Sequence, residues 1–232
     1  RGSRKRGYGV EFGKADWRDF ERGLEKEWLV TNGLGGFASG TIIGANARRY
    51  HGLLVAALRP PTRRVLLWAK MEERLVAAGE TYNLAANQTR AGVTDAGFWH
   101  LQRVVVDPLP TFTYSFSDIT LEKTVFMVHG RNTTVVRYRV KNGARAATVW
   151  LTPLVNCRDF HGNTYRGQVD FEATPLANGV KVRGLPDVPA LVLACTAGEF
   201  HCRPDWYYGM FYALEDDRGL NPVEDRSEEH TS

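Results

Sequence analysis

Alternation of apolar and polar residues runs through most of the chain and predicts β-strands. The clearest case is Thr111–Ser117, which reads TFTYSFS and places Phe112, Tyr114 and Phe116 on one face. A strict period of two is the pattern of a half-buried strand. Apolar runs rich in β-branched residues predict further strands at Trp28–Thr31, Ile119–Val128, Thr133–Val140, Ala147–Val155, Val180–Arg183 and Ala190–Thr196. Asn-Gly pairs favour two-residue hairpins, so turns are expected at Asn142-Gly143 and Asn178-Gly179.

The segment Arg64–Leu84 has more than one interpretation. Two strands, Arg64–Met71 and Arg74–Leu84, could join near Glu72-Glu73; alternatively a strand and a bend lead to a hairpin about Ala78-Gly79. A helix over Val65–Ala78 is a third interpretation, because Leu, Ala, Lys, Met and Glu form helices well. We favour strands, since the aliphatic residues cluster and do not recur at helical spacing.

Short helices are predicted only at Asp16–Glu25 and Asp205–Glu215. The remaining turns separate strands about every ten residues, and strands do not alternate with helices. This organisation predicts an all-β fold, a sandwich of mostly antiparallel sheets with few short helices.

Composition narrows the class of protein further. The 232 residues are 43% hydrophobic, enough for a substantial core, and the net charge of +4 includes the basic terminal stretch RGSRKR. The chain has neither the basic stripe of a nucleic-acid binder nor an apolar run of membrane-spanning length. The three cysteines form no CxxC pair, and Cys195, His201 and Cys202 do not match a zinc-ligand spacing. We therefore expect no nucleic acid, membrane, metal or cofactor, and without a secretory signal we expect a cytoplasmic protein.

The stretch NGLGGFASGTIIGANARRYHGLL, from Asn32 to Leu54, contains six glycines followed by a dense polar cluster. Its glycine spacing fits a relaxed dinucleotide-binding pattern, which also needs a helix after the loop and an acidic residue about twenty positions on. Gly40–Gly44 is a poor helix start, and His51–Pro61 contains no Asp or Glu, so phosphate binding is disfavoured. The glycines are better explained as turns that present a polar surface made of Asn46, Arg48, Arg49, Tyr50 and His51. The alternative is that Arg48 or Arg49 pairs with a carboxylate such as Glu72 or Glu73 and stabilises the sheet.

The last seven residues, RSEEHTS at 226–232, differ abruptly from the sequence before them. They match the translation of a common sequencing-library adapter, so we expect the natural sequence to diverge after Asp225. An ordinary disordered C-terminal tail is the alternative.

Long motifs resemble the N-terminal domain of bacterial and archaeal type glycogen debranching enzymes. The resemblance begins in EWLVTNGLGGFASGTIIGANARRYHGLLVAAL, Glu27–Leu58, and continues in Leu121–Val140, Thr152–Thr164 and Asp205–Asp225. It implies a β-supersandwich over residues 27–225, preceded by a basic segment at 1–26. It also implies that this domain precedes an (α/α)6 barrel, absent from this chain, whose carboxylic acids perform amylo-α-1,6-glucosidase chemistry on glycogen or limit dextrins.

The resemblance therefore implies no catalytic residue in this chain. Asp159, Glu215 and Asp216 are expected to be structural or interface carboxylates. The implied partners are the catalytic barrel of the same chain and α-glucan, and a stand-alone glucan-binding or structural module is the alternative. The polar surface after the glycine run is a candidate substrate-binding site, and a second polar run joins it: Arg158, Asp159 and His161. An aromatic run is a candidate domain interface: Trp206, Tyr207 and Tyr208.

Overall fold

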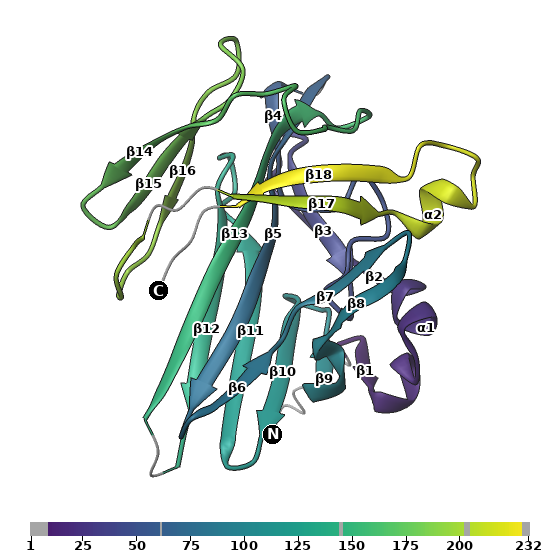
Figure 1. Cartoon of the computed structure of the whole chain (residues 1–232), viewed down its shortest axis with the longest axis vertical. Coiled ribbons are helices and arrows are strands. Elements are labelled where there is room, and N and C mark those ends of the chain that lie inside the picture. The colour runs from purple at the N-terminus through teal and green to yellow at the C-terminus, as the bar shows by residue number, and fades with distance from the viewer. Residues whose placement is uncertain (1–8, 61, 144–145, 202–204, 229–232) are drawn as a thin grey trace, which may run out of the picture.

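The computed structural model describes residues 9–60, 62–143, 146–201 and 205–228. Strands dominate this part of the chain and form three sheets of five, ten and three strands (Figure 1). The helical elements described are α1 (Phe20–Leu24), α2 (Ala213–Asp216) and two short 3-10 segments, η1 (Lys14–Trp17) and η2 (Gly97–His100). All strand pairs in the three sheets are antiparallel within the described residues, which confirms the predicted all-β sandwich class.

The five-stranded sheet has the order β1-β9-β10-β11-β12 and forms one layer of the sandwich. Its strands are β1 (Glu11–Gly13), β9 (Leu101–Val105), β10 (Thr111–Phe116), β11 (Ile119–Met127) and β12 (Thr134–Lys141). In β10 the burial alternates as the sequence predicts, because Phe112, Tyr114 and Phe116 are each 3% exposed.

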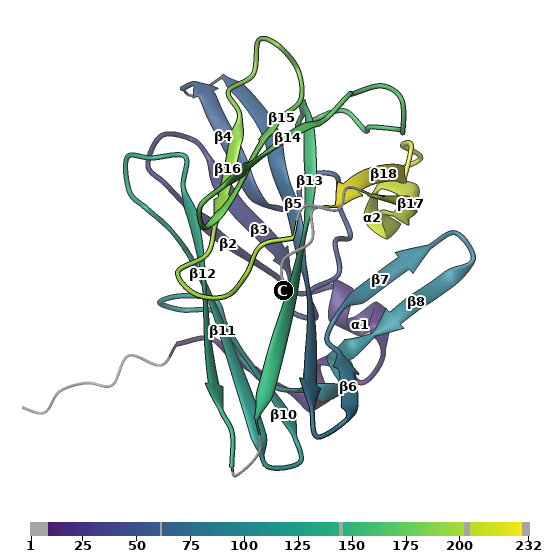
Figure 2. The same cartoon turned by 60° about the vertical axis from the view of Figure 1, so that its left-hand side comes forward.

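The ten-stranded sheet forms the other layer, in the order β2-β3-β4-β5-β13-β18-β17-β7-β8, with β6 paired to β5. Its strands are β2 (Glu27–Thr31), β3 (Phe37–Thr41), β4 (Gly52–Arg59), β5 (Arg63–Ala77), β6 (Glu80–Asn83), β7 (Ala86–Thr89), β8 (Gly92–Ala96), β13 (Ala147–Asp159), β17 (Asp205–Phe211) and β18 (Val223–Glu228). The long strands β5 and β13 run side by side through the molecule, while β17 and β18 cross above them (Figures 1 and 2).

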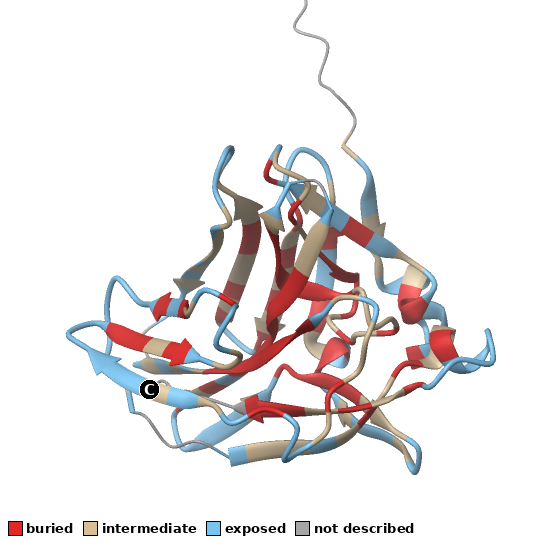
Figure 3. Cartoon of the chain, turned by 90° about the horizontal axis from the view of Figure 1, so that it is seen from above, coloured by how far each residue is buried: buried red, intermediate tan, exposed pale blue. Residues whose placement is uncertain are grey.

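The two large sheets pack face to face. Trp28 of β2 meets Phe112 of β10 edge to face, with ring centroids 6.1 Å apart. Glu73 of β5 accepts a hydrogen bond from Tyr138 of β12 and pairs with Lys123 of β11, both at 2.5 Å. Buried residues therefore concentrate between the layers (Figure 3). The third sheet, β14 (Glu172–Leu176), β15 (Gly179–Arg183) and β16 (Leu191–Ala194), adds its buried side chains to the same core.

The strands favoured for Arg64–Leu84 are confirmed, whereas one of the two turns suggested there and the Asn142-Gly143 hairpin are wrong. Glu72-Glu73 is not a turn, because β5 continues through it, and a helix over Val65–Ala78 does not form. The hairpin forms at Ala78-Gly79, the alternative position. Both residues have positive φ, as a tight turn between paired strands requires. Asn142-Gly143 does not join paired strands either, since β12 and β13 belong to different sheets and β13 pairs with β5.

The two predicted helices have different outcomes. Asp16–Glu25 is partly helical, as η1 and α1. The prediction for Asp205–Glu215 is wrong over most of its length, because β17 extends to Phe211 and pairs with β18. Pairing with a neighbouring strand satisfies the backbone of β17 and overrides its local helix propensity.

The predicted N- and C-terminal segments lie partly outside the described residues, at 1–8 and 229–232, as does Cys202. Within the C-terminal segment, Arg226–Glu228 belong to β18, and Arg226 and Ser227 are buried. These three residues are therefore not a disordered tail. The boundary after Asp225 stays a prediction.

Candidate functional site

Hydrogen bonds of the Asn32 side chain hold the glycine run and connect the two layers. The Asn32 side chain accepts hydrogen bonds from the backbone N–H groups of Leu34 (2.9 Å) and Gly36 (3.0 Å). Its amide nitrogen donates to the carbonyl of Arg131 (3.1 Å) and to the side chain of Asn132 (2.9 Å), in the loop between β11 and β12. A phosphate loop needs free backbone N–H groups, and here two of them bind a buried side chain of the same chain.

The two predicted polar runs meet in loops of the ten-stranded sheet, and we call this region the polar edge. Arg49 and Tyr50 come from the loop between β3 and β4, and Arg158 and His161 come from the end of β13 and the loop after it. The Tyr50 hydroxyl lies 3.1 Å from His161 Nδ1, and Arg49 donates to the His161 carbonyl at 2.7 Å. Arg158 donates to the Arg49 carbonyl at 2.7 Å. The structure thus brings together residues separated by more than a hundred positions.

Under this edge lies a buried ionic network. Arg158 binds Glu224 of β18, and their side chains are 5% and 0% exposed. The Tyr212 hydroxyl also donates to Glu224, and Arg226 Nε lies 3.5 Å from the same carboxylate. Burial lowers the pKa of Arg158, but the Glu224 charge outweighs this effect and raises it. Arg158 is therefore always charged, and it stabilises the buried network instead of contacting a ligand.

Arg49 has a similar internal partner. Its Nε lies 3.4 Å from Glu215 of α2, a carboxylate that is fully buried, and its backbone N–H also donates to Glu215 at 3.3 Å. Glu215 was not among the partners expected for Arg49, because it lies 166 positions away. Asp159 instead accepts from the His161 backbone N–H at 2.9 Å and is exposed.

The other predicted residues of the first run lie around Glu27 of β2. Arg48 Nε lies 2.6 Å and His51 Nε2 lies 3.1 Å from Glu27 Oε1. His51 is 2% exposed, and its Nδ1 accepts the Ala47 N–H at 3.0 Å, so both ring nitrogens are used internally. Asn46 donates to the Ala69 carbonyl at 3.1 Å. The alternative that Arg48 or Arg49 pairs with a carboxylate is confirmed, although the carboxylates are Glu27 and Glu215 and not the suggested Glu72 or Glu73.

Glu27 makes stability depend on acid pH. Burial raises its pKa, but hydrogen bonds from His51 and Arg48 outweigh this and lower the pKa from 4.5 to about 2. Because the carboxyl is more acidic when folded, its contribution is complete above pH 4.5 and is lost as the pH falls toward 2. Urea unfolding at about pH 5 and about pH 3 should therefore show a smaller loss of stability for Glu27→Gln than for the wild type.

The control for this experiment is Glu25→Gln, which removes an exposed carboxylate two residues away. Its stability should fall with pH as steeply as that of the wild type. An identical pH dependence for the wild type and Glu27→Gln would contradict the role of Glu27.

Fewer of the predicted residues are exposed at the polar edge than the sequence predicted. Two residues that were not predicted, Tyr165 and Asn221, are also exposed there or partly so. We define the loop surface as Tyr50, Asp159, His161, Tyr165 and Asn221. Asn221, from the loop before β18, donates to the Tyr165 hydroxyl at 2.6 Å. Of the predicted residues, Tyr50, Asp159 and His161 reach this surface, whereas Asn46, Arg49, His51 and Arg158 bind internal partners. Arg48 is 34% exposed and pairs with Glu27, outside the loop surface.

The predicted aromatic interface in β17 is divided between two sides of the strand. Trp206 packs on Phe171, with ring centroids 5.9 Å apart, and the Tyr208 hydroxyl accepts from Arg166 at 2.6 Å. Tyr207 lies between them in sequence and lines a cavity on the other side of the strand. The three rings therefore do not form one continuous patch. Their role as a domain interface stays a prediction.

The described residues were also compared with what a metal site, a disulfide bond or a membrane-spanning helix requires. Among them, no group of three or more His, Cys, Asp and Glu is placed to hold a metal ion. Cys157 is buried, Cys195 is exposed, and both are free thiols. No helix in the described ranges is long and apolar enough to cross a membrane.

The fold and the loop surface define a β-sandwich domain with a polar edge built by loops. Comparison with protein families matches residues 26–230 to the family described as "Glycogen debranching enzyme N terminal". The match covers nearly the whole chain, and the chain belongs to this family. Comparison with curated proteins and with solved structures gave no match.

Proposed function

We propose that this chain is the non-catalytic N-terminal domain of a glycogen-debranching glycoside hydrolase. In this proposal it supports an (α/α)6 catalytic barrel of the same protein, and its loop surface contributes to binding of α-glucan. The observation that carries the proposal is the family match over residues 26–230.

The chemistry of the carboxylates supports a non-catalytic role. Glycoside hydrolysis needs two carboxyl groups that face the same sugar, one as acid and one as base or nucleophile. Glu215 and Glu224 at this edge are fully buried and bound by arginines. Asp159 is exposed, and one of its oxygens accepts a backbone N–H. Of these three carboxylates Asp159 is the exposed one, and the buried pair stabilises the loops that surround it.

The loop surface has the composition of a carbohydrate contact. Tyr50 and Tyr165 offer aromatic faces, on which the apolar face of a sugar ring can pack. His161 and Asn221 add donors and acceptors that suit hydroxyl groups. Tyr50 is held by edge-to-face packing on Phe160, with centroids 5.5 Å apart, so its ring is oriented before a ligand arrives.

Two measurements test the proposal. The purified chain, incubated with phosphorylase limit dextrin, should release no glucose. It should sediment with glycogen, and His161→Ala should weaken this binding about fivefold, the effect of losing one energetically important contact. His201→Ala removes another exposed histidine, away from the loop surface, and should bind like the wild type.

Glucose release by the chain alone would overturn the non-catalytic assignment. Glycogen binding that is the same for His161→Ala and His201→Ala would contradict the role of the loop surface.

A further inference from the structure

A second feature lies on the outer side of the long β5–β13 pair, away from the loop surface. It is a cavity of about 340 Å³, open to solvent. Its lining comes from five strands and one loop: Glu72, Glu73 and Arg74 of β5, Thr81 and Asn83 of β6, Ala85, Asp95 of β8, Trp150 and Thr152 of β13, and Tyr207 of β17. Known ligand sites have volumes of about 300–1,000 Å³, so this cavity is large enough for one or two sugar rings.

The floor of the cavity follows from strand alternation. Glu72 pairs across the sheet with Thr152, and Arg74 pairs with Trp150. Residues two apart on a strand share a face, so these four side chains lie on one side of the sheet. Glu73 points the other way, into the sandwich, where Lys123 and Tyr138 bind it.

A chain of hydrogen bonds holds the acidic groups of the cavity in place. Asn87 donates to Glu72 (3.2 Å) and to Asp95 (3.0 Å), and Asn83 donates to the other oxygen of Asp95 at 2.8 Å. Lys70 binds Glu72 Oε1 at 2.9 Å and is anchored by the Ala86 carbonyl at 2.7 Å. The carboxylates are therefore oriented before any ligand binds, which lowers the entropic cost of binding.

Glu72 is held through one of its two oxygens. It is 7% exposed, and in the described part of the chain its hydrogen bond from Asn87 and its ion pair with Lys70 both end on Oε1. Glu72 also lines the cavity, so this oriented carboxylate can accept a hydrogen bond from a donor there. Hydroxyl groups of a ligand in the cavity would supply such donors.

Charge and shape point to a neutral ligand with an apolar face. Glu72 is balanced by Lys70 and Glu73 by Lys123, and the lining carries one further acid, Asp95, and one further base, Arg74. Trp150 lines the cavity and is 39% exposed, an unusual degree of exposure for so large an apolar ring. An aromatic face beside oriented carboxylates and amides suits a sugar, whose ring has an apolar face and an edge of hydroxyl groups.

We propose that this cavity is a binding site for a neutral, hydroxyl-rich ligand, namely one or two glucose units of an α-glucan chain. Trp150 packs on the sugar face, and Glu72 and Asp95 accept its hydroxyl groups. The choice of glucose units rests on the proposed function, whereas the site itself rests on the cavity. It lies apart from the loop surface, so the two can be tested separately.

Titration with maltotriose tests the site. In two-dimensional NMR spectra, the indole N–H signal that Trp150→Ala removes should shift as maltotriose is added to the wild type. By calorimetry, Trp150→Ala should weaken maltotriose binding about tenfold, the expected effect of losing one aromatic contact. Asp95→Asn should also weaken binding, since it replaces one of two oriented carboxylates.

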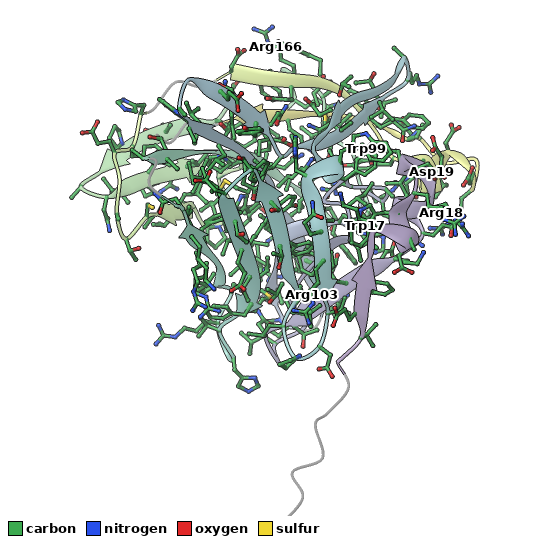
Figure 4. All side chains as sticks on the ribbon, turned by 90° about the horizontal axis from the view of Figure 1, so that it is seen from below. Trp17, Arg18, Asp19, Trp99, Arg103 and Arg166 are labelled. Carbon is green, nitrogen blue, oxygen red and sulfur yellow. The ribbon has the colours of Figure 1, made fainter. Side chains whose placement is uncertain are left out.

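Trp99→Ala is the matched control. Trp99 is 58% exposed and lies outside the cavity lining, on the side of the molecule that carries Trp17 and Asp19 (Figure 4). This variant should bind maltotriose like the wild type.

The outcomes separate this inference from the proposed function. Maltotriose binding that survives Trp150→Ala but is lost in His161→Ala would overturn the cavity site and support the loop surface. Binding lost in Trp150→Ala alone would support the cavity site. No shift of the Trp150 signal at about 20 mM maltotriose, above the millimolar range of weak sites, would also overturn the cavity site, while the glucose-release test remains independent of it.

Discussion

Arg158→Ala is expected to lower the free energy of unfolding by about 3 kcal/mol, the lower end of the range for breaking a buried ion pair. The substitution leaves the Glu224 carboxylate, which is 0% exposed, without its principal partner. Tyr212 and Arg226 still contact Glu224, which keeps the effect from being larger. The substitution also removes the hydrogen bond from Arg158 to the Arg49 carbonyl. Urea unfolding at neutral pH measures the change.

The control is Arg103→Ala, which removes an arginine from an exposed ion pair with Glu11 on the five-stranded sheet. Arg103 contacts Glu11 through Nε at 2.5 Å, as close as many buried pairs, and lies at the surface (Figure 4). Because solvent screens exposed charges, its unfolding midpoint should not change measurably. Equal effects of Arg103→Ala and Arg158→Ala would show that burial of the Arg158–Glu224 pair does not determine its contribution.

Gly97→Ala is expected to destabilise the fold by about 2–3 kcal/mol, the upper part of the usual range for overpacking. Gly97 follows β8 directly, and Leu84 precedes β7, so their close contact closes the base of the β7–β8 hairpin. A Cβ at Gly97 would overlap the backbone of Leu84, which cannot rotate away as a side chain could. Urea unfolding again gives the free energy. Maltotriose binding should weaken as well, because this hairpin carries Asn87 and Asp95.

The control is Gly13→Ala, because a Cβ at Gly13 meets no atom within 4 Å and its φ of −125° suits any residue. This variant should be as stable as the wild type or slightly more stable. If both alanine variants unfold at the same urea concentration, the contact between Gly97 and Leu84 does not constrain the hairpin.

Much of the sandwich could be predicted from local pattern. Strands at Thr111–Ser117, Ile119–Val128 and Thr133–Val140 appear as β10, β11 and β12 with shifts of at most one residue at their ends. Alternation identifies such strands because one face must be apolar to pack on the core. The family, too, could be recognised from sequence, by the long motif at Glu27–Leu58.

The failures share one cause, which is contact with other strands. Glu72-Glu73 looks like a turn because two acidic residues interrupt an apolar run. The structure keeps both inside a strand, since Lys70 and Asn87 bind one carboxylate while Lys123 and Tyr138 bind the other. Local sequence does not show that these partners will be close enough to offset burial.

In the candidate site, too, some features follow from local sequence and others from tertiary contacts. The sequence alone determined that the chain is an all-β member of the glycogen debranching enzyme N-terminal family, and that polar residues gather after the glycine run and around the end of β13. Only the tertiary structure decided which of them are exposed. Arg49 and Arg158 turn inward to Glu215 and Glu224, 166 and 66 positions away, because a buried carboxylate requires a charged partner more strongly than a solvated loop does. The same packing leaves Trp150 beside a cavity, since strand pairing between β5 and β13 sets which side chains share a face.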